Sequence, residues 1–372
     1  MMRVAVNLLW LRPGAVGGTE TYIVRLLEAL RGRDDVAPIL YCAPDVVDAH
    51  PSLEVFDARL SPPVTGSRPA RVALESTWLA GRLRRDRPDV VHHPGGMIPA
   101  GAPGPSMVTI HDLQPLTSPE RFGIAKVAWL GQMLPRSARR ASLVSAPSSH
   151  TAAVITRVLG IDDVAVVPST PGEIGPRPAP DVVAAALTRL GVGQPFVLYP
   201  AITYRHKNHA VLVAALAVAR NSDLTVVFCG GVGDAESDID AAARRHGVSE
   251  RVHRLGRVDA DDLEALYAAA VALAFPSWHE GFGLPVAEAF ARRCAVVAAN
   301  ATALPEVVGD AGLLIDPHDA DAWAEALDSL TNDGIRRSAL AQRGLERAAQ
   351  WAPEASADRL VAAYRRTAGG AR

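Results

Sequence analysis

The chain has 372 residues, a formal net charge of −2 and an apolar share of 49%, a composition that excludes an intrinsically disordered protein. At roughly 100–200 residues per domain, the length predicts two domains. The near-neutral charge disfavours a nucleic-acid partner, and three widely separated cysteines disfavour a disulfide framework or a structural zinc site and indicate a reducing compartment.

The N-terminal segment 1–14 contains a short apolar run that predicts a first strand. It lacks the longer apolar stretch and the small-residue cleavage site of a signal peptide. No apolar run approaches the roughly 20 residues that span a bilayer. We therefore expect a cytoplasmic protein, with peripheral contact at the inner membrane face left open.

Short apolar runs without polar alternation recur along the chain, as expected for strands that are buried on both faces. Those in the first half cover residues 3–8, 37–41, 90–92, 107–111, 143–146 and 164–167. Those in the second half cover residues 196–199, 224–229, 252–255, 271–275, 295–299 and 312–315.

Longer alanine-rich segments separate these runs and predict helices. Alternation of strands and helices on this scale predicts parallel sheets with right-handed crossovers. The predicted helices include residues 20–30, 208–219, 261–270, 320–330 and 353–366.

A proline-rich stretch, 168–181, interrupts the alternation near the middle of the chain. We expect a Rossmann-like domain over 1–170, a linker over 171–190, a second Rossmann-like domain over 191–352 and a final helical segment over 353–372. The predicted fold class is α/β, with two doubly wound parallel-sheet domains facing a central cleft. Ligands of such sheets bind at the carboxyl ends of the strands, so the chemistry is expected there.

The stretch PSWHEGFGLPVAEAF follows a predicted strand and opens a helix. Gly281 and Gly283 lack side chains, so the backbone amides of Phe282, Gly283 and Leu284 are able to approach a ligand at the positive end of that helix. Glu280 precedes the turn, and its carboxylate suits the paired hydroxyls of a sugar. The alternative is a glycine turn beside a surface glutamate.

Glu280 and Glu288, eight residues apart, resemble the E-x7-E motif of family-4 retaining glycosyltransferases, which have the GT-B fold. The flanking segments 255–277 and 295–327 also resemble that family, and a weaker similarity covers nearly the whole chain. The resemblance implies that Glu280 binds hydroxyls of the donor sugar and Glu288 the nucleotide ribose. It also implies that the final helix crosses back to the first domain.

A cationic loop, Arg205, His206 and Lys207, precedes a predicted helix. Cations at a helix start oppose the helix dipole, and a bound diphosphate would resolve that conflict. Lys207 is one of only two lysines among 38 basic residues, and it matches the family's phosphate-binding lysine. The sequence departs from the family at Ala201, where glycine is usual, and at Ile202, where some members carry a second arginine. Arg205 is a candidate for that missing charge; solvated surface cations are the alternative.

Gly17 and Gly18 precede the first predicted helix and permit close approach of a phosphate to the backbone. The resemblance places this loop against the donor diphosphate and the acceptor. A simple glycine turn is the alternative. We expect Thr19 to cap the helix.

His111 and Asp112 end a predicted strand, and a histidine there is able to hydrogen-bond a sugar or to act in acid–base chemistry. The resemblance implies that His111 lines the donor-sugar pocket, and we expect Asp112 to orient the loop. His93 lies in a loop that resembles the acceptor-side loop of mannosyltransferase-like members. Ser148 matches a family serine loop on the acceptor side or, alternatively, caps the next helix.

The resemblance implies a retaining hexosyltransferase, and we expect Lys207, Glu280 and His111 to carry its reaction. The donor is expected to be a nucleotide-diphosphate sugar, GDP-mannose first and UDP-, ADP- or TDP-sugars next, with the base read around Leu255 to Val258. The acceptor is expected to be a glycan, a glycolipid or a small molecule. No metal or other cofactor is expected, because lysine and backbone amides are able to neutralise the diphosphate.

Other functions remain as alternatives. A catalytically silent nucleotide-binding module, an epimerase and a phosphorylase are each compatible with the fold. The sequence lacks the motifs of a nicotinamide site, a P-loop and a hydrolase elbow. Arginine clusters at Arg82–Arg87 and Arg136–Arg140 indicate solvated helix faces or, alternatively, contact with an anionic membrane.

Overall fold

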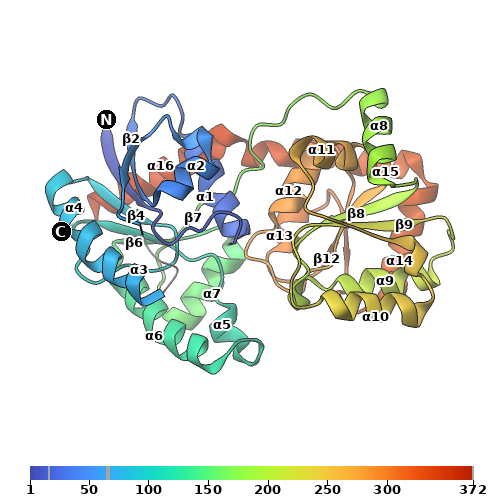
Figure 1. The fold of residues 1–372 in the computed structure, drawn as a ribbon, viewed down its shortest axis with the longest axis horizontal. Helices are drawn as coiled ribbons and strands as arrows, with labels where there is room; N and C mark the ends of the chain where they lie inside the picture. Colours follow the sequence, from blue (N-terminus) through green and yellow to red (C-terminus); the bar gives the residue numbers. More distant parts are fainter. Residues whose placement is uncertain (16, 64–67, 371–372) are drawn as a thin grey trace. The chain divides into compact units, whose positions relative to one another are not determined.

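The computed structural model describes residues 1–15, 17–63 and 68–370. The chain divides into two compact units (Figure 1). Unit 1 comprises Met1–Gly172 and the C-terminal segment from Trp351, and unit 2 comprises Glu173–Gln350.

Unit 1 is built on a parallel sheet of seven strands in the order β3-β2-β1-β4-β5-β6-β7. The strands are β1 (Met2–Asn7), β2 (Val36–Cys42), β3 (Asp57–Leu60), β4 (Val90–His93), β5 (Ser106–Thr109), β6 (Leu143–Ala146) and β7 (Val164–Val166).

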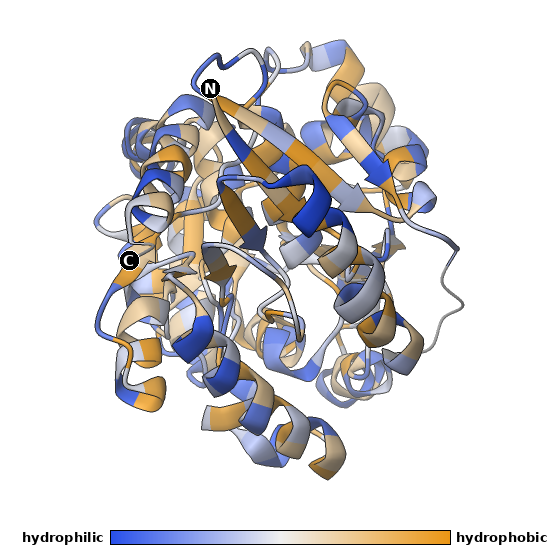
Figure 2. Cartoon of the chain, turned by 90° about the vertical axis from the view of Figure 1, so that its left-hand side faces the viewer, coloured by the Kyte–Doolittle hydropathy of each residue, from blue (hydrophilic) through white to orange (hydrophobic). Residues whose placement is uncertain are grey.

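Helices cover both faces of this sheet, and a separate hydrophobic core fills the space on each face. Figure 2 shows apolar strands beside helices that carry both polar and apolar residues. The helices are α1 (Gly18–Ala29), α2 (Pro44–Ala49), η1 (Pro51–Leu53), α3 (Arg68–Leu74), the π-helical turn η2 (Glu75–Leu79), α4 (Ala80–Asp86), α5 (Gln114–Thr117), η3 (Pro119–Arg121), α6 (Ile124–Arg140), α7 (Ser149–Leu159) and α16 (Pro353–Gly369).

The C-terminal helix α16 belongs to unit 1, where it packs against α1 and the central strands. The Tyr364 hydroxyl lies 2.9 Å from His92 Nδ1, and the other ring nitrogen of His92 lies 2.8 Å from the Thr109 hydroxyl. All three side chains are completely buried. The chain therefore returns from unit 2 to complete the core of unit 1.

Unit 2 contains a parallel sheet of six strands in the order β10-β9-β8-β11-β12-β13. The strands are β8 (Phe196–Pro200), β9 (Thr225–Cys229), β10 (Val252–Gly256), β11 (Ala272–Phe275), β12 (Val296–Ala299) and β13 (Leu313–Ile315). The helices are α8 (Pro180–Leu190), η4 (Arg205–Lys207), α9 (His209–Val218), α10 (Glu236–His246), η5 (Ser249–Arg251), α11 (Ala260–Ala269), α12 (Leu284–Ala291), α13 (Leu304–Val308), α14 (Ala320–Asn332), α15 (Gly334–Ala348) and η6 (Ala349–Trp351).

The two sheets share a strand order in which the connections reverse direction between two neighbouring central strands. This switch point lies between β1 and β4 in unit 1 and between β8 and β11 in unit 2. Ligands of open α/β sheets bind outside the carboxyl ends of the strands at such a point. The two doubly wound sheets confirm the predicted fold class.

All twelve predicted strands are present, whereas β3 was not predicted. Its sequence, Asp-Ala-Arg-Leu, lies at the sheet edge, and none of its four residues is buried, so it carries no apolar run. The predicted linker over 171–190 is also corrected, because its second half forms α8, which packs against α11 in unit 2. Among the described residues, no helix has both the length and the apolarity needed to cross a membrane.

Candidate functional site

The switch point of unit 2 brings together two charged side chains that lie 73 residues apart in the sequence. Lys207 follows β8 and Glu280 follows β11. The Lys207 ammonium lies 2.6 Å from Glu280 Oε1, and the two side chains are only 19% and 13% exposed. A largely buried ion pair therefore occupies the edge of the sheet where a ligand is expected.

Three hydrogen bonds hold the loops that carry this ion pair. Asn208 adopts a left-handed conformation, with φ 56°, and its amide donates to the carbonyls of Pro276 at 3.2 Å and Pro317 at 2.7 Å. The backbone N–H of Trp278 donates to the carbonyl of His206 at 2.9 Å. The loop after β8 is thereby fixed to the loop after β11.

The start of α12 lies beside Glu280 in the sequence and depends on two special residues. Gly283 has φ 102°, which strongly favours glycine, and an added Cβ atom would lie 2.6 Å from Leu304 Cδ2. Pro285 occupies the first turn, where a missing N–H costs no hydrogen bond. The turn therefore presents the N-terminus of an eight-residue helix, and its positive dipole end, to the same edge of the sheet.

Opposing effects set the charge of Glu280. Burial, the largest single effect, raises the pKa of its carboxyl, but the charge and hydrogen bond of Lys207, together with Ser277 and His206, lower that pKa below its ordinary value on balance. The backbone N–H of Glu280 also donates to the Thr302 hydroxyl at 2.9 Å. At neutral pH the site thus holds a carboxylate and an ammonium in fixed positions.

Replacing Asn208 by glycine tests the coupling between the two loops. Glycine accepts the left-handed backbone but removes both side-chain hydrogen bonds, so we expect a loss of about 2 kcal/mol of unfolding free energy, at roughly 1 kcal/mol for each bond. We also expect weaker nucleotide-sugar binding, because Lys207 loses its support. Chemical denaturation and calorimetry measure the two effects, and unchanged values in both would contradict this role.

The other predicted donor residues differ in exposure. Glu288 is 9% exposed on α12, and the Tyr267 hydroxyl donates to its Oε2 at 3.3 Å. Arg205 is exposed, and its Nε lies 3.5 Å from Asp238 Oδ2. Val258 follows the edge strand β10 and is half-buried.

In unit 1, Gly17 has φ 68° and precedes α1, which begins at Gly18. The predicted capping role of Thr19 is wrong, because the N-cap position is Gly17 and carries no side-chain hydrogen bond. Glu20 instead organises this loop. Its carboxylate accepts the Gly14 backbone N–H at 3.0 and 3.1 Å and lies 2.9 Å from His50 Nε2.

His111 lies just beyond β5, and its Nε2 lies 2.8 Å from the Pro94 carbonyl. A carbonyl only accepts hydrogen bonds, so Nε2 carries the proton. Burial lowers the pKa of the His111 ring, although the hydrogen bond to Pro94 raises it to a smaller extent. The ring is therefore neutral at pH 7, and its Nδ1 is an acceptor.

The remaining predicted residues of unit 1 mostly support the backbone. Asp112 Oδ1 accepts the Gln114 N–H at 3.1 Å, which orients the loop as expected. Ser148 is buried and caps α7, with its hydroxyl accepting the Thr151 N–H at 3.1 Å, so the capping alternative applies. His93 is completely buried and is the last residue of β4, which corrects its predicted place in a loop.

Comparisons with known proteins agree with this arrangement. Residues 186–347 match the family described as glycosyl transferases group 1, and residues 16–170 match glycosyltransferase family 4. The chain is 32% identical over 290 residues to O-antigen chain mannosyltransferase B of Escherichia coli. The aligned region covers 76% of this chain and 75% of that protein.

The chain belongs to glycosyltransferase family 4. The family's reaction moves a sugar from a nucleotide sugar to an acceptor. A D-inositol 3-phosphate glycosyltransferase of Corynebacterium aurimucosum is 38% identical over 169 residues, or 43% of this glycosyltransferase and 40% of that protein.

Solved structures show that the glycosyltransferase has the GT-B fold. Anabaena HepE in complex with UDP and glucose has a TM-score of 0.75 and 20% identity, covering 97% of this chain and 99% of HepE. Sucrose-phosphate synthase of Thermosynechococcus elongatus has a TM-score of 0.78 and 22% identity, covering 98% of both chains.

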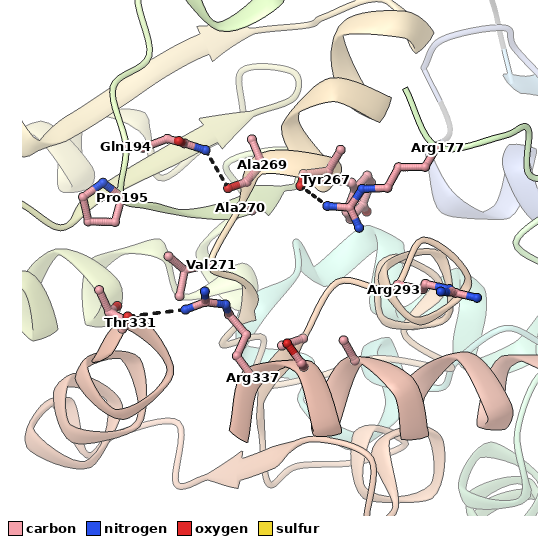
Figure 3. Close-up of a pocket in the computed structure, with 14 residues that line it drawn as sticks. Arg177, Gln194, Pro195, Tyr267, Ala269, Ala270, Val271, Arg293, Thr331 and Arg337 are labelled. Atoms are coloured by element: carbon pink, nitrogen blue, oxygen red, sulfur yellow. Dashed lines mark hydrogen bonds between the residues drawn. The ribbon is translucent and has the colours of Figure 1, made fainter. Parts of the chain in front are cut away.

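A pocket of about 440 Å³ lies elsewhere in unit 2 of the glycosyltransferase (Figure 3). It is lined by residues that precede β8, β11 and β12, and so lies at the sheet edge opposite Lys207 and Glu280. Arg177 donates to the Ala268 carbonyl at 2.6 Å and Arg337 to the Thr331 carbonyl at 3.3 Å. These arginines satisfy carbonyls at the ends of α11 and α14.

The arginine clusters of the glycosyltransferase are partly structural. Arg84 donates to the Gly101 carbonyl at 3.2 Å, and Arg140 donates to the carbonyls of Pro99 at 2.8 Å and Ala102 at 2.6 Å. Both arginines thereby support the loop after β4.

Sequence reasoning missed several residues that position the site. Asn208 adjoins Lys207, and its tolerance of left-handed backbone was an available signal. Thr302 lies far in the sequence from its partner, the backbone N–H of Glu280, and Tyr267 lies far from the Glu288 carboxylate, so no local pattern revealed them.

Proposed function

We propose that this glycosyltransferase transfers a hexose, with retention of anomeric configuration, from a nucleotide-diphosphate sugar to a glycan, glycolipid or small-molecule acceptor. The observation that carries the proposal is the Lys207–Glu280 ion pair at the switch point of unit 2. Unit 2 binds the donor and unit 1 takes the acceptor.

The reaction breaks the bond between the sugar and the diphosphate, so negative charge grows on the leaving group. Lys207 stabilises that charge, and the amides at the start of α12 contribute through the helix dipole. Glu280 binds hydroxyls of the transferred sugar and faces the positive charge that develops at its anomeric carbon. Glu288, turned toward Tyr267, binds the ribose.

Proton transfer completes the step. The acceptor hydroxyl attacks from the face of the leaving group, and the departing phosphate takes its proton. Glu280 then acts as a binding group and not as a covalent nucleophile. The neutral His111 ring accepts a hydrogen bond from a donor-sugar hydroxyl through Nδ1.

GDP-mannose is the first candidate donor, because a mannosyltransferase matches three quarters of the chain. UDP-sugars are the second candidate, since HepE has been solved with UDP and glucose. The proposal requires no metal ion, because Lys207 and the helix dipole supply the positive field.

A thermal-shift screen with GDP-mannose, UDP-glucose, ADP-glucose and TDP-glucose tests the donor. We expect one donor at 100 times its dissociation constant to raise the unfolding free energy by about 2.7 kcal/mol. NMR of the glycosylated product then reports its anomeric configuration, and EDTA should leave the rate unchanged. Stabilisation by none of the four donors, or an inverted product, would contradict the proposal.

A further inference from the structure

The pocket of unit 2 in Figure 3 has the composition of an anion site, and we call it the arginine pocket. Its volume of about 440 Å³ lies in the range of about 300–1,000 Å³ that is usual for small-ligand sites. Arg177, Arg293 and Arg337 line it, and no Asp or Glu is among the described residues that do so. The lining therefore carries three positive charges and, among its described residues, no negative side chain.

The three arginines come from three different segments of the chain (Figure 3). Arg177 precedes α8, Arg293 follows α12 and Arg337 lies on α15. None of the three forms an ion pair with a described carboxylate, whereas the neighbouring Arg292 places its Nε 2.9 Å from both carboxylate oxygens of Glu264. The positive charge of the pocket is thus available to a ligand.

Two of the arginines also bind backbone carbonyls, but with only part of their hydrogen-bonding capacity, since a guanidinium group has five N–H donors. Arg177 donates through Nη2 to the Ala268 carbonyl at 2.6 Å. Arg337 donates through Nη1 to the carbonyls of Leu330 at 2.6 Å and Thr331 at 3.3 Å. Within the part of the chain that the structure describes, the other N–H groups of both side chains have no hydrogen-bond partner.

Helix ends offset part of the positive charge. The C-termini of α11, α12 and α14 all reach the pocket, and each is equivalent to roughly −0.5 of an elementary charge. Together they balance about half of the charge of the three arginines. The remaining field is positive and attracts an anion.

The backbone conformation of Arg293 is strained, because its φ of 54° lies in the left-handed region that strongly favours glycine. The Arg293 N–H donates to the Phe290 carbonyl at 3.0 Å, and the Cys294 N–H donates to the Ala289 carbonyl at 2.8 Å. These two bonds form the Schellman motif, which usually has glycine at the position of Arg293. Strained residues cluster at ligand sites, so the Arg293 side chain has a use beyond ending α12.

We propose that the arginine pocket binds the phosphate group of a small organic phosphate. A phosphate group matches the planar fork of N–H donors that each guanidinium presents. Val271, Ala295 and Ala341 add apolar surface, and the volume leaves room for an organic body beside the phosphate. The pocket lies at the sheet edge opposite Lys207 and Glu280, so it is distinct from the donor site and does not depend on the proposed function.

Isothermal titration calorimetry with glucose 6-phosphate and AMP tests the site, with glucose and adenosine as their uncharged counterparts. We expect at least one of the two phosphates to bind with a dissociation constant below about 1 mM, and about tenfold or more tightly than its uncharged counterpart. Arg177 and Arg293 are exposed to solvent, where salt screens their charges. The binding should therefore weaken when NaCl is raised from about 20 to about 200 mM.

Two substitutions of Arg293 separate the ligand from the fold. Arg293→Gly and Arg293→Gln both remove the charge, so each should weaken phosphate binding by about 10-fold, as for loss of one hydrogen bond to a charged group. Only glycine relieves the left-handed backbone, so Arg293→Gly should also raise the melting temperature by about 2–4 °C. The matched control, Arg343→Gln, should bind as wild type does, because Arg343 is exposed on the same helix as Arg337 but does not line the pocket.

Lys207→Met distinguishes the arginine pocket from the donor site, and this variant should keep the phosphate binding. Loss of binding in Lys207→Met together with its retention in Arg293→Gly would place the phosphate at the donor site and overturn the proposal. Equal affinity in Arg293→Gly, Arg293→Gln and Arg343→Gln, the result expected if Arg293 only ends the helix, would also overturn it. Binding of neither phosphate overturns it as well, whether or not vesicles of phosphatidylglycerol bind the protein instead.

Discussion

Replacing Lys207 by methionine is expected to lower kcat for sugar transfer by about 10²- to 10³-fold, the usual effect of removing one group that stabilises charge in a transition state. Methionine retains the apolar stem and removes the ammonium that lies 2.6 Å from Glu280. The measurement is steady-state release of the nucleoside diphosphate at saturating donor.

The same substitution is expected to destabilise the fold. It leaves the largely buried Glu280 carboxylate without its cation, and breaking a buried pair in this way costs about 3 kcal/mol. The double variant Lys207→Met with Glu280→Gln removes both charges, so it should recover most of that unfolding free energy while its activity stays low. Urea denaturation measures the unfolding free energy.

Lys126 provides the matched control, because it is the only other lysine in the chain and lies exposed on α6. Lys126→Met should keep wild-type activity and stability. Wild-type turnover in a folded Lys207→Met enzyme would exclude the proposed phosphate-binding role. Loss of activity that is restored in the double variant would show that Lys207 acts only by supporting the fold.

Acidification from pH 7 to pH 5 is expected to remove about 4 kcal/mol of unfolding free energy through the three buried histidines with the largest pKa shifts, offset in part by Glu75. Burial lowers the pKa of His93 to about 3. Burial, helped by the Lys207 charge, lowers that of His209 to about 3. Burial also lowers the pKa of His92 well below its usual value. Glu75, with its pKa raised to about 7, acts in the opposite direction.

The sign follows from proton uptake. Unfolded histidines have a pKa of about 6.5, so below that pH they bind protons that the folded histidines do not. The stabilisation of the folded state by these neutral histidines is therefore complete above a pH of about 6.5 and is lost as the pH falls. Each histidine contributes a loss of about 2 kcal/mol by pH 5, and protonation of folded Glu75 offsets about 2 kcal/mol. Urea titrations across this range measure the sum.

A single substitution isolates one contribution. His209 packs against Tyr199 and Phe228, with ring centroids at 4.6 and 4.9 Å, so His209→Phe should keep the packing and reduce the loss on acidification by about 2 kcal/mol. The exposed His246 at the end of α10 supplies the control, His246→Gln, which should follow wild type. Equal pH dependence in all three proteins would contradict the assignment to buried histidines.

The amino-acid sequence alone was sufficient to predict the architecture and the Glu280–Glu288 motif. Strands buried on both faces need continuous apolar runs, and twelve such runs match observed strands. The short edge strand β3 was not predicted, because a strand that is not buried does not need apolar residues. Glu280, Gly283 and the start of α12 were also readable, since turn and helix-start preferences are local.

The roles of residues that depend on distant partners became visible only in the folded structure. The Lys207–Glu280 ion pair and the Asn208 hydrogen bonds form because the sheet order places β8 beside β11. The burial of His93 and its contact with Asn7 depend in the same way on β1 lying beside β4. Sequence patterns record each residue's local backbone preference, whereas pKa values and hydrogen-bond partners depend on neighbours that only folding brings together.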